Sequence, residues 1–217
     1  MTTSMLSAAL LMHRRGISKD LLISRLMFVY NEVQARNGLV QLTIYPTTKI
    51  MNTYLQYISD FIETKNGVIQ PLSNSSKSLM MLSYYRNNLI HIFVNEAEIM
   101  TAVSMLTRNK AWTTLEEVFE KTMFLKDLLS CEFVLRDTMR TKEDVDKLLR
   151  FMHQRKFLKF EGEKVYIDLN NDEELIKQSF LCQQILPYVD TYALTLAFFS
   201  VGPAVQIHEE ELTYQKI

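Results

Sequence analysis

One segment, residues 78–106, restricts the possible folds more than any other part of the chain. It is the longest nearly continuous apolar run, SLMMLSYYRNNLIHIFVNEAEIMTAVSML, and it contains the polar insert YYRNN. At about 100° per residue, a helix here is apolar over most of its circumference, which is typical of a buried helix. The same geometry places Ser83, Asn87 and His91 on one line. A row of hydrogen-bonding side chains is therefore predicted along a core helix.

These polar side chains form a signature that needs partners. An unsatisfied buried polar group costs about 1–3 kcal/mol, so each is expected to pair with a neighbouring element. One interpretation is a buried polar network that holds the helices in register. The other is an interface or channel that touches a further domain. The signature residues are Tyr84, Tyr85, Arg86, Asn87, Asn88 and His91.

Composition indicates a folded chain with a substantial core. The chain has 217 residues, of which 47% are hydrophobic, so disorder is not expected. With 24 basic and 25 acidic residues, the net charge of -1 provides no field for nucleic acid or for an anionic membrane surface. Cys131 and Cys182 stand alone in the sequence, which favours free thiols in a reducing compartment.

Helical periodicity and turn signals predict a mainly α fold: one domain, residues 1–217, of about eight helices with one small β-hairpin late in the chain. Residues 68–77 are interpreted as a loop and a possible internal boundary, and residues 39–45 as a short β-like run. We detect no internal repeat. Helices are predicted over residues 5–13, 18–36, 50–62, 78–94, 95–106, 113–129, 141–154, 171–184 and 188–201.

Individual residues mark the ends of these elements. Ser18 and Thr141 are predicted helix caps, and residues 113–116 read as a capping box. Asn95 is expected to interrupt the long apolar segment, and Pro187 to separate the last two helices. Two alternating arms around Glu161-Gly162-Glu163 predict the hairpin.

Motifs for common catalytic and metal chemistry are not found in the sequence. None of His13, His91, His153 and His208 has a second His or Cys three or four residues away, so no metal site is predicted. Glycine-rich phosphate loops and the G-x-S-x-G motif do not occur. Both cysteines fall in apolar helical runs, where a thiol is usually inert.

Five segments, in order, resemble the C-terminal domain of the glycerol-3-phosphate / dihydroxyacetone-phosphate acyltransferase family. The most specific is LSYYRNNLIHIFVNEAEIMTAV, residues 82–103. The others are SAALLMHRRGISKDLLISRLMFVYNEVQARNG, LKDLLSCEFVLRD, EGEKVYID and FLCQQILPYVDTYALTLAFF. The family's domain usually continues past the last of these helices, so a partial chain is expected.

The resemblance implies an accessory role in an enzyme that transfers an acyl group from acyl-CoA, its co-substrate, to glycerol 3-phosphate or dihydroxyacetone phosphate in glycerophospholipid synthesis. The family's His-x-x-x-x-Asp motif is absent. His91 is followed by Glu96 at that spacing, but within a predicted helix. We therefore assign no catalytic or substrate-binding residue and no cofactor, and expect the chain alone to be inactive.

The expected partner is the acyltransferase catalytic domain, with a membrane reached through the full-length enzyme. An intracellular location at the mitochondrial outer membrane is favoured, with the peroxisomal membrane as the alternative. The apolar helix at residues 188–201 has no basic polar face. We therefore expect it to pack inside the domain, or against the absent remainder of the chain, and not on a membrane. The alternative function is a free-standing helical interaction module.

Residues 141–169 have the order of a winged-helix unit, a helix followed by a hairpin. Basic side chains on this helix are offset by Glu143, Asp144 and Asp146. The wing tip, Glu161-Gly162-Glu163, is acidic, whereas a wing that binds DNA needs cations. Nucleic-acid binding is therefore not predicted.

Overall fold

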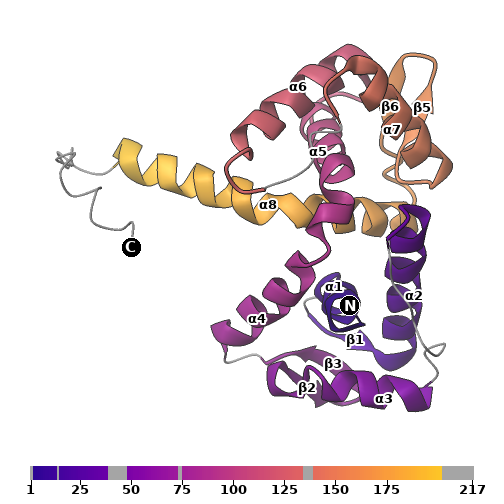
Figure 1. Cartoon of the computed structure of the whole chain (residues 1–217), viewed down its shortest axis with the longest axis vertical. Helices are drawn as coiled ribbons and strands as arrows, with labels where there is room; N and C mark the ends of the chain where they lie inside the picture. The colour runs from indigo at the N-terminus through magenta and orange to yellow at the C-terminus, as the bar shows by residue number, and fades with distance from the viewer. Residues whose placement is uncertain (1, 14, 39–47, 73–74, 134–138, 202–217) are drawn as a thin grey trace.

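The computed structural model describes residues 2–13, 15–38, 48–72, 75–133 and 139–201, and in this part the fold is mainly α, as predicted (Figure 1). The N-terminal half contains α1 (Thr2–Leu11), β1 (Ile17–Ser18), α2 (Lys19–Ala35), α3 (Thr48–Gln56), η1 (Ser59–Phe61), β2 (Ile62–Lys65) and β3 (Val68–Pro71). The C-terminal half contains α4 (Ser76–Asn87), α5 (Ile90–Leu106), β4 (Thr113–Thr114), α6 (Leu115–Leu128), α7 (Lys142–Gln154), β5 (Lys159–Glu161), β6 (Lys164–Tyr166) and α8 (Asp172–Val201).

The two halves repeat one topology that the sequence did not reveal. In each, a helix leads to a two-residue strand, then to two helices and a hairpin, and the short strand pairs with the second strand of the hairpin. The sheet orders are β1-β3-β2 and β4-β6-β5, all antiparallel. The winged-helix order predicted for residues 141–169 thus belongs to a larger unit that includes β4, and the N-terminal half contains a second such unit.

The first hairpin corrects the prediction of a loop over residues 68–77, because residues 68–71 form β3. It also corrects the predicted third helix, which ends at Gln56 and not at residue 62. Asn66 and Gly67 have φ of 52° and 77°, the geometry of a type I′ turn that joins two antiparallel strands. The Asn-Gly pair is therefore a hairpin signal here. The β-like run predicted at residues 39–45 lies outside the described residues.

Helix caps agree well with the sequence pattern. The side-chain oxygen of Ser18 accepts a hydrogen bond from Leu21 N at the start of α2. Thr141 forms a capping box with Asp144. The box of α6 is displaced by one residue from the prediction, since it joins Thr114 to Glu117. Pro187 does not end a helix, because α8 continues through it as a single helix of 30 residues.

Two buried helices organise the core. Residues 4–11 of α1 are buried on every side, and the helix contacts α2 and α4 (Figure 1). In the C-terminal half, α5 lies between α6 and α8. Within the described residues no single helix is long and apolar enough to cross a membrane; α4 and α5 reach that length only together, and they are bent by 97°.

Gly16 is a position where we expect a methyl group to be costly. Its φ is +108°, and a Cβ there would lie 2.3 Å from Val68 Cγ1, next to the pairing of β1 with β3. Gly67 also has positive φ, but a Cβ there would meet nothing within 4 Å. We expect Gly67→Ala to cost about 1–2 kcal/mol from backbone strain, and Gly16→Ala at least ~1 kcal/mol more from crowding. Urea denaturation measures both, and equal losses would contradict the crowding.

Candidate functional site at the bend between α4 and α5

The signature is divided by the sharp bend between α4 and α5. α4 ends at Asn87 and α5 begins at Ile90, so the predicted line through Ser83, Asn87 and His91 is not formed. The predicted interruption at Asn95 is wrong, because α5 runs through that residue. Two consecutive asparagines are poor helix formers, and burial of Leu89 and Ile90 turns the chain back into the core. The interruption therefore falls inside the signature.

One part of the signature faces inward. Arg86 is buried, and its Nη2 donates a hydrogen bond of 3.1 Å to Asn87 Oδ1. The side chain of Asn87 donates through Nδ2 to the hydroxyl oxygen of Tyr188, 3.2 Å away on α8, and burial raises the pKa of Tyr188. Tyr85 packs against Phe61, with ring centroids 6.1 Å apart. These contacts tie the end of α4 to α8 and to η1.

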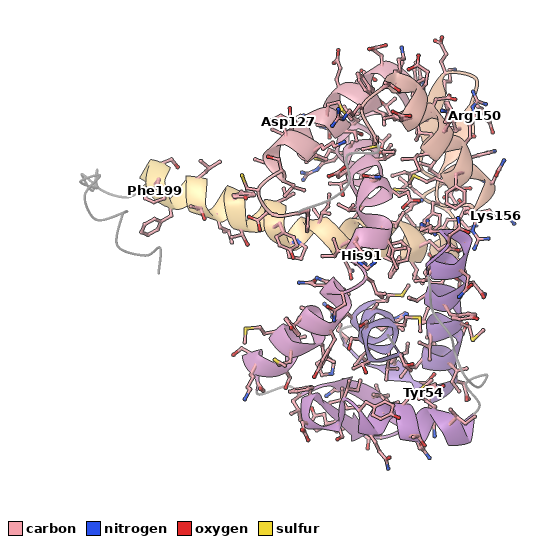
Figure 2. All side chains as sticks on the ribbon, viewed as in Figure 1. Tyr54, His91, Asp127, Arg150, Lys156 and Phe199 are labelled. Carbon is pink, nitrogen blue, oxygen red and sulfur yellow. The ribbon has the colours of Figure 1, made fainter. Side chains whose placement is uncertain are left out.

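The other part of the signature faces solvent. Tyr84 is 63% exposed, and Asn88 and His91 are exposed as well. Met80, 64% exposed, precedes Tyr84 by four residues, so Met80, Tyr84 and Asn88 follow one stripe of the helix. His91 lies just beyond the bend, in the first turn of α5 (Figure 2). We call Met80, Tyr84, Asn88 and His91 the signature surface.

Sequence reasoning missed a largely buried ionic cluster that links the end of α2 with α5 and with the end of α7. Glu32 lies on α2 and Arg36 is the C-cap residue of that helix, whereas Glu96 lies on α5 and Arg155 follows α7. Arg36 Nε lies 3.0 Å from Glu96 Oε1, and Arg36 Nη1 lies 2.8 Å from Glu32 Oε2. Glu32 also pairs with Arg155. The cluster of two guanidinium and two carboxylate groups is neutral as a whole, and it joins the two halves.

Aromatic rings enclose the guanidinium of Arg36. Its Cζ lies 4.9 Å from the ring centroid of Phe93, 5.1 Å from that of Phe151 and 5.7 Å from that of Phe157. Such stacking is stronger when the cation is removed from water. Burial raises the pKa of Glu96, and the adjacent Arg36 opposes that rise. The i, i+4 spacing of Glu32 and Arg36 in the sequence could have predicted this one ion pair of the cluster.

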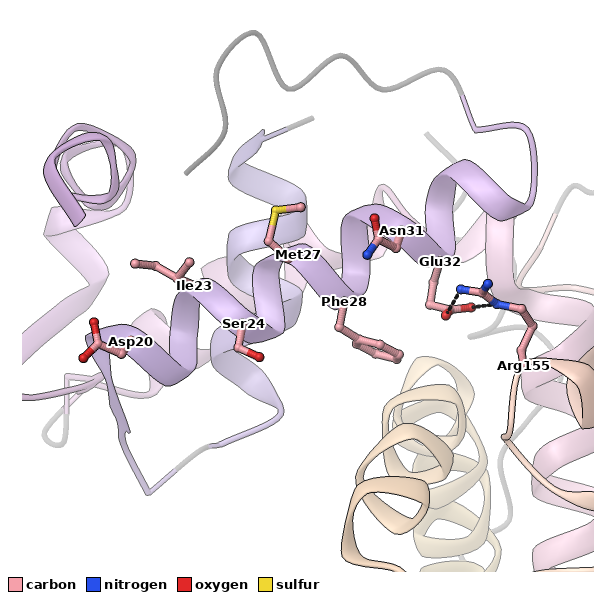
Figure 3. A pocket seen from close by; sticks show the side chains of 8 residues that line it. All are labelled: Asp20, Ile23, Ser24, Met27, Phe28, Asn31, Glu32 and Arg155. Atoms are coloured by element: carbon pink, nitrogen blue, oxygen red, sulfur yellow. Dashed lines mark hydrogen bonds and ion pairs between the residues drawn. The ribbon is translucent and has the colours of Figure 1, made fainter. Parts of the chain in front are cut away.

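A pocket of about 580 Å³ lies along α2, with the ion pair of Glu32 and Arg155 at one end (Figure 3). Three charged side chains line the pocket. Glu32 and Arg155 pair with each other, and Asp20 lies at the opposite end. This arrangement provides no nucleophile with an adjacent general base. The lining residues are Asp20, Ile23, Ser24, Met27, Phe28, Asn31, Glu32 and Arg155.

A second polar contact joins α2 to the start of α8. Arg25 pairs with Glu173 at 2.9 Å, and its Nε donates to His13 Nε2 at 3.2 Å. Burial and the charge of Arg25 lower the pKa of His13, so its ring accepts this hydrogen bond in the neutral form. The described geometry makes His13 a structural link between helices.

The histidine and cysteine positions can be compared with the predictions. His91 is exposed, whereas Glu96 is buried and bound to Arg36, so the two residues do not form a catalytic pair. Cys182 is buried, and burial raises the pKa of its thiol. Cys131 is exposed after α6, so the prediction that it lies in an apolar helix is wrong. In the described part of the chain no three His, Cys, Asp or Glu side chains gather in a group that suits a metal ion.

Comparison with known protein families decides the relationship. A family model described as the glycerol-3-phosphate acyltransferase C-terminal region matches residues 1–215. The chain belongs to this family. A search of curated proteins gave no match.

The match spans both structural repeats of this acyltransferase C-terminal region, together with the bend and the ionic cluster. The resemblance found in the sequence is thereby confirmed at the level of the family. The bend lies within residues 82–103, the segment that carries the most specific part of the resemblance, and it interrupts the helix there.

Proposed function

We propose that this acyltransferase C-terminal region is an accessory domain that braces the catalytic domain of an acyl-CoA:glycerol-3-phosphate (or dihydroxyacetone-phosphate) O-acyltransferase. In this proposal the full enzyme acts in glycerophospholipid synthesis with acyl-CoA as co-substrate. It is associated with a membrane, the mitochondrial outer membrane being favoured over the peroxisomal one. The chain alone supplies no catalytic residue and needs no metal or other cofactor.

The observation that supports this proposal most is the division of the signature into two parts. Arg86 and Asn87 are held by α4 and α8, so the backbone beneath the signature surface is fixed. The side chains of Tyr84 and Met80 project from this fixed backbone into solvent. A large, pre-ordered aromatic side chain loses little entropy when a partner covers it, which suits a docking anchor. The same surface would bind a different protein if the chain were a free-standing module.

The affinity of this chain for a separately expressed acyltransferase domain tests the proposal. Tyr84→Ala is expected to weaken binding by about tenfold or more, because it removes a docking anchor. Tyr57→Ala is a matched control, since Tyr57 is 59% exposed at the end of α3. We expect the control to bind as the unchanged chain does. Equal affinities for both variants, or no binding by the unchanged chain, would contradict docking through the signature surface.

A further inference from the structure

The outer end of α8 projects from the rest of the molecule (Figure 1). Residues 193–200, which we call the apolar tip, are all exposed, including Leu194 at 71% and Phe198 at 71%. Tyr192, just before the tip, is held by a hydrogen bond to Glu132. The expectation that this helix packs inside the domain is therefore wrong for the tip in the described structure, whereas packing against a further part of the protein stays a prediction. Phe199 marks its outer end in Figure 2.

Apolar side chains surround the tip on all sides. At about 100° per residue, Leu194 and Leu196 point in nearly opposite directions, about 200° apart. Both are at least 70% exposed, as is Phe198, and Phe199 is 59% exposed. A groove on a protein binds one stripe of an amphipathic helix and leaves the opposite face in solvent. An environment that encloses the whole circumference fits the tip better.

The three aliphatic hydroxyl groups of this segment form hydrogen bonds within the helix. Thr191 and Thr195 donate their hydroxyl hydrogens to the carbonyl oxygens of Pro187 and Thr191, at 2.7 and 2.8 Å. Ser200 donates to the carbonyl oxygen of Ala197 at 2.9 Å. Residues 191–201 contain no charged side chain, and the nearest charge before them is Asp190. These hydroxyls require neither water nor a partner, which lowers the cost of moving the helix into hydrocarbon.

The length of the segment matches one leaflet of a bilayer. Eleven residues, 191–201, extend about 16 Å at 1.5 Å per residue. The hydrocarbon core of a bilayer is about 30 Å thick, so one leaflet contributes about 15 Å. The segment is too short to cross a membrane, but long enough to enter one leaflet from the side on which the domain lies.

We propose that the apolar tip of α8 inserts into one leaflet of a lipid bilayer, so that this chain contacts lipid directly. The contact depends on apolar burial and not on charge, so zwitterionic phosphatidylcholine, which has no net charge, is a sufficient target. The proposal goes beyond the docking of the catalytic domain and uses a different surface of the molecule.

Flotation of the full chain with phosphatidylcholine vesicles tests the insertion. The unchanged chain is expected to float with the vesicles, with little change in 0.5 M salt. Leu194→Glu/Phe199→Glu should reduce the bound fraction by about tenfold or more, because each change places a carboxylate in hydrocarbon. Leu169→Glu/Phe124→Glu is the matched control at side chains exposed by 72% and 55% outside the tip, and it should float as the unchanged chain does. Circular dichroism verifies that all three proteins are folded.

Quenching of tryptophan fluorescence measures how deeply the apolar tip enters the bilayer. Phe198→Trp in a Trp112→Phe background places the single tryptophan in the tip, and lipids brominated on their acyl chains are expected to quench it. The proposal is overturned if the folded chain stays with the soluble fraction, if both double variants lose binding equally, or if acyl-chain bromines do not quench. Concentration-dependent dimerisation without flotation, abolished by the tip variant, would assign the tip to a second copy of the chain and also overturn it. Since no catalytic domain is present, these outcomes are independent of the docking experiment.

Discussion

Replacing Arg36 with methionine is expected to lower the free energy of unfolding by about 3–5 kcal/mol, because it leaves a buried carboxylate without its cation. Glu96 pairs with Arg36, and both side chains are at most 7% exposed. Glu32 retains Arg155 in the variant. The loss therefore arises mainly at Glu96, together with the aromatic contacts of the guanidinium. Urea denaturation followed by circular dichroism measures it.

The pH dependence of this loss has a definite sign. Arg36 opposes the rise that burial causes in the pKa of Glu96, so its removal raises that pKa further. A carboxyl group whose pKa is higher in the folded state than in the unfolded state destabilises the protein as the pH rises. The deficit of Arg36→Met should thus be smallest at acidic pH, where Glu96 is protonated. It should grow between the pKa of Glu96 in the unchanged protein and the higher pKa in the variant, and stay constant above that.

Arg150→Met provides the matched control. Arg150 forms an i, i+4 ion pair with Asp146 at 2.7 Å, but its side chain is 64% exposed. An exposed pair contributes about 1 kcal/mol or less, so we expect a correspondingly small loss. If both arginine variants lost the same stability, the ionic cluster would not be the strong link between the two halves that the geometry indicates.

Phe93→Ala is expected to cost about 3–5 kcal/mol, since it removes a fully buried ring and leaves a cavity. The ring of Phe93 meets Phe180 of α8 edge-on at 5.2 Å, and Phe180 meets Phe28 of α2 in the same way at 5.5 Å. The substitution therefore affects the contact of α5 with α8 and, through Phe180, with α2. Thermal and urea denaturation measure the loss.

A control variant and a double variant complete the test of Phe93→Ala. Phe124→Ala removes the same side chain from a site that is 55% exposed, and we expect it to change stability by only about 0.5 kcal/mol. Phe93 also supports the guanidinium of Arg36. The losses from Arg36→Met and Phe93→Ala should not add in the double variant, because residues in contact are coupled. Strict additivity would contradict that contact.

The local features of the fold could be predicted from the sequence because their determinants are local. Ser18 and Thr141 cap helices through bonds to backbone groups three residues away. The Glu161-Gly162-Glu163 hairpin follows from alternation on two adjacent arms. The mainly α class follows from helical periodicity along most of the chain. None of these features requires knowledge of distant contacts.

The features that were missed depend on distant contacts. The ionic cluster joins residues 32, 36, 96 and 155, and only the pair on α2 has a readable spacing. The bend falls at Asn88 because the burial of Leu89 and Ile90 outweighs the cap signal at Asn95. Pro187 lies within α8, where tertiary packing of the preceding turns overrides the cost of its missing hydrogen bond. The candidate site shows the same limit, since its residues could be identified from the sequence but their orientation toward core or solvent could not.

Acyl transfer from radiolabelled acyl-CoA to glycerol 3-phosphate tests the accessory role most directly. It compares this chain alone, a separately expressed acyltransferase domain alone, and their mixture. We expect no activity from the chain alone, and more activity from the mixture than from the domain alone. Tyr84→Ala should reduce that gain, and Tyr57→Ala should not. Activity of the chain alone, or a mixture no more active than the domain by itself, would contradict the account.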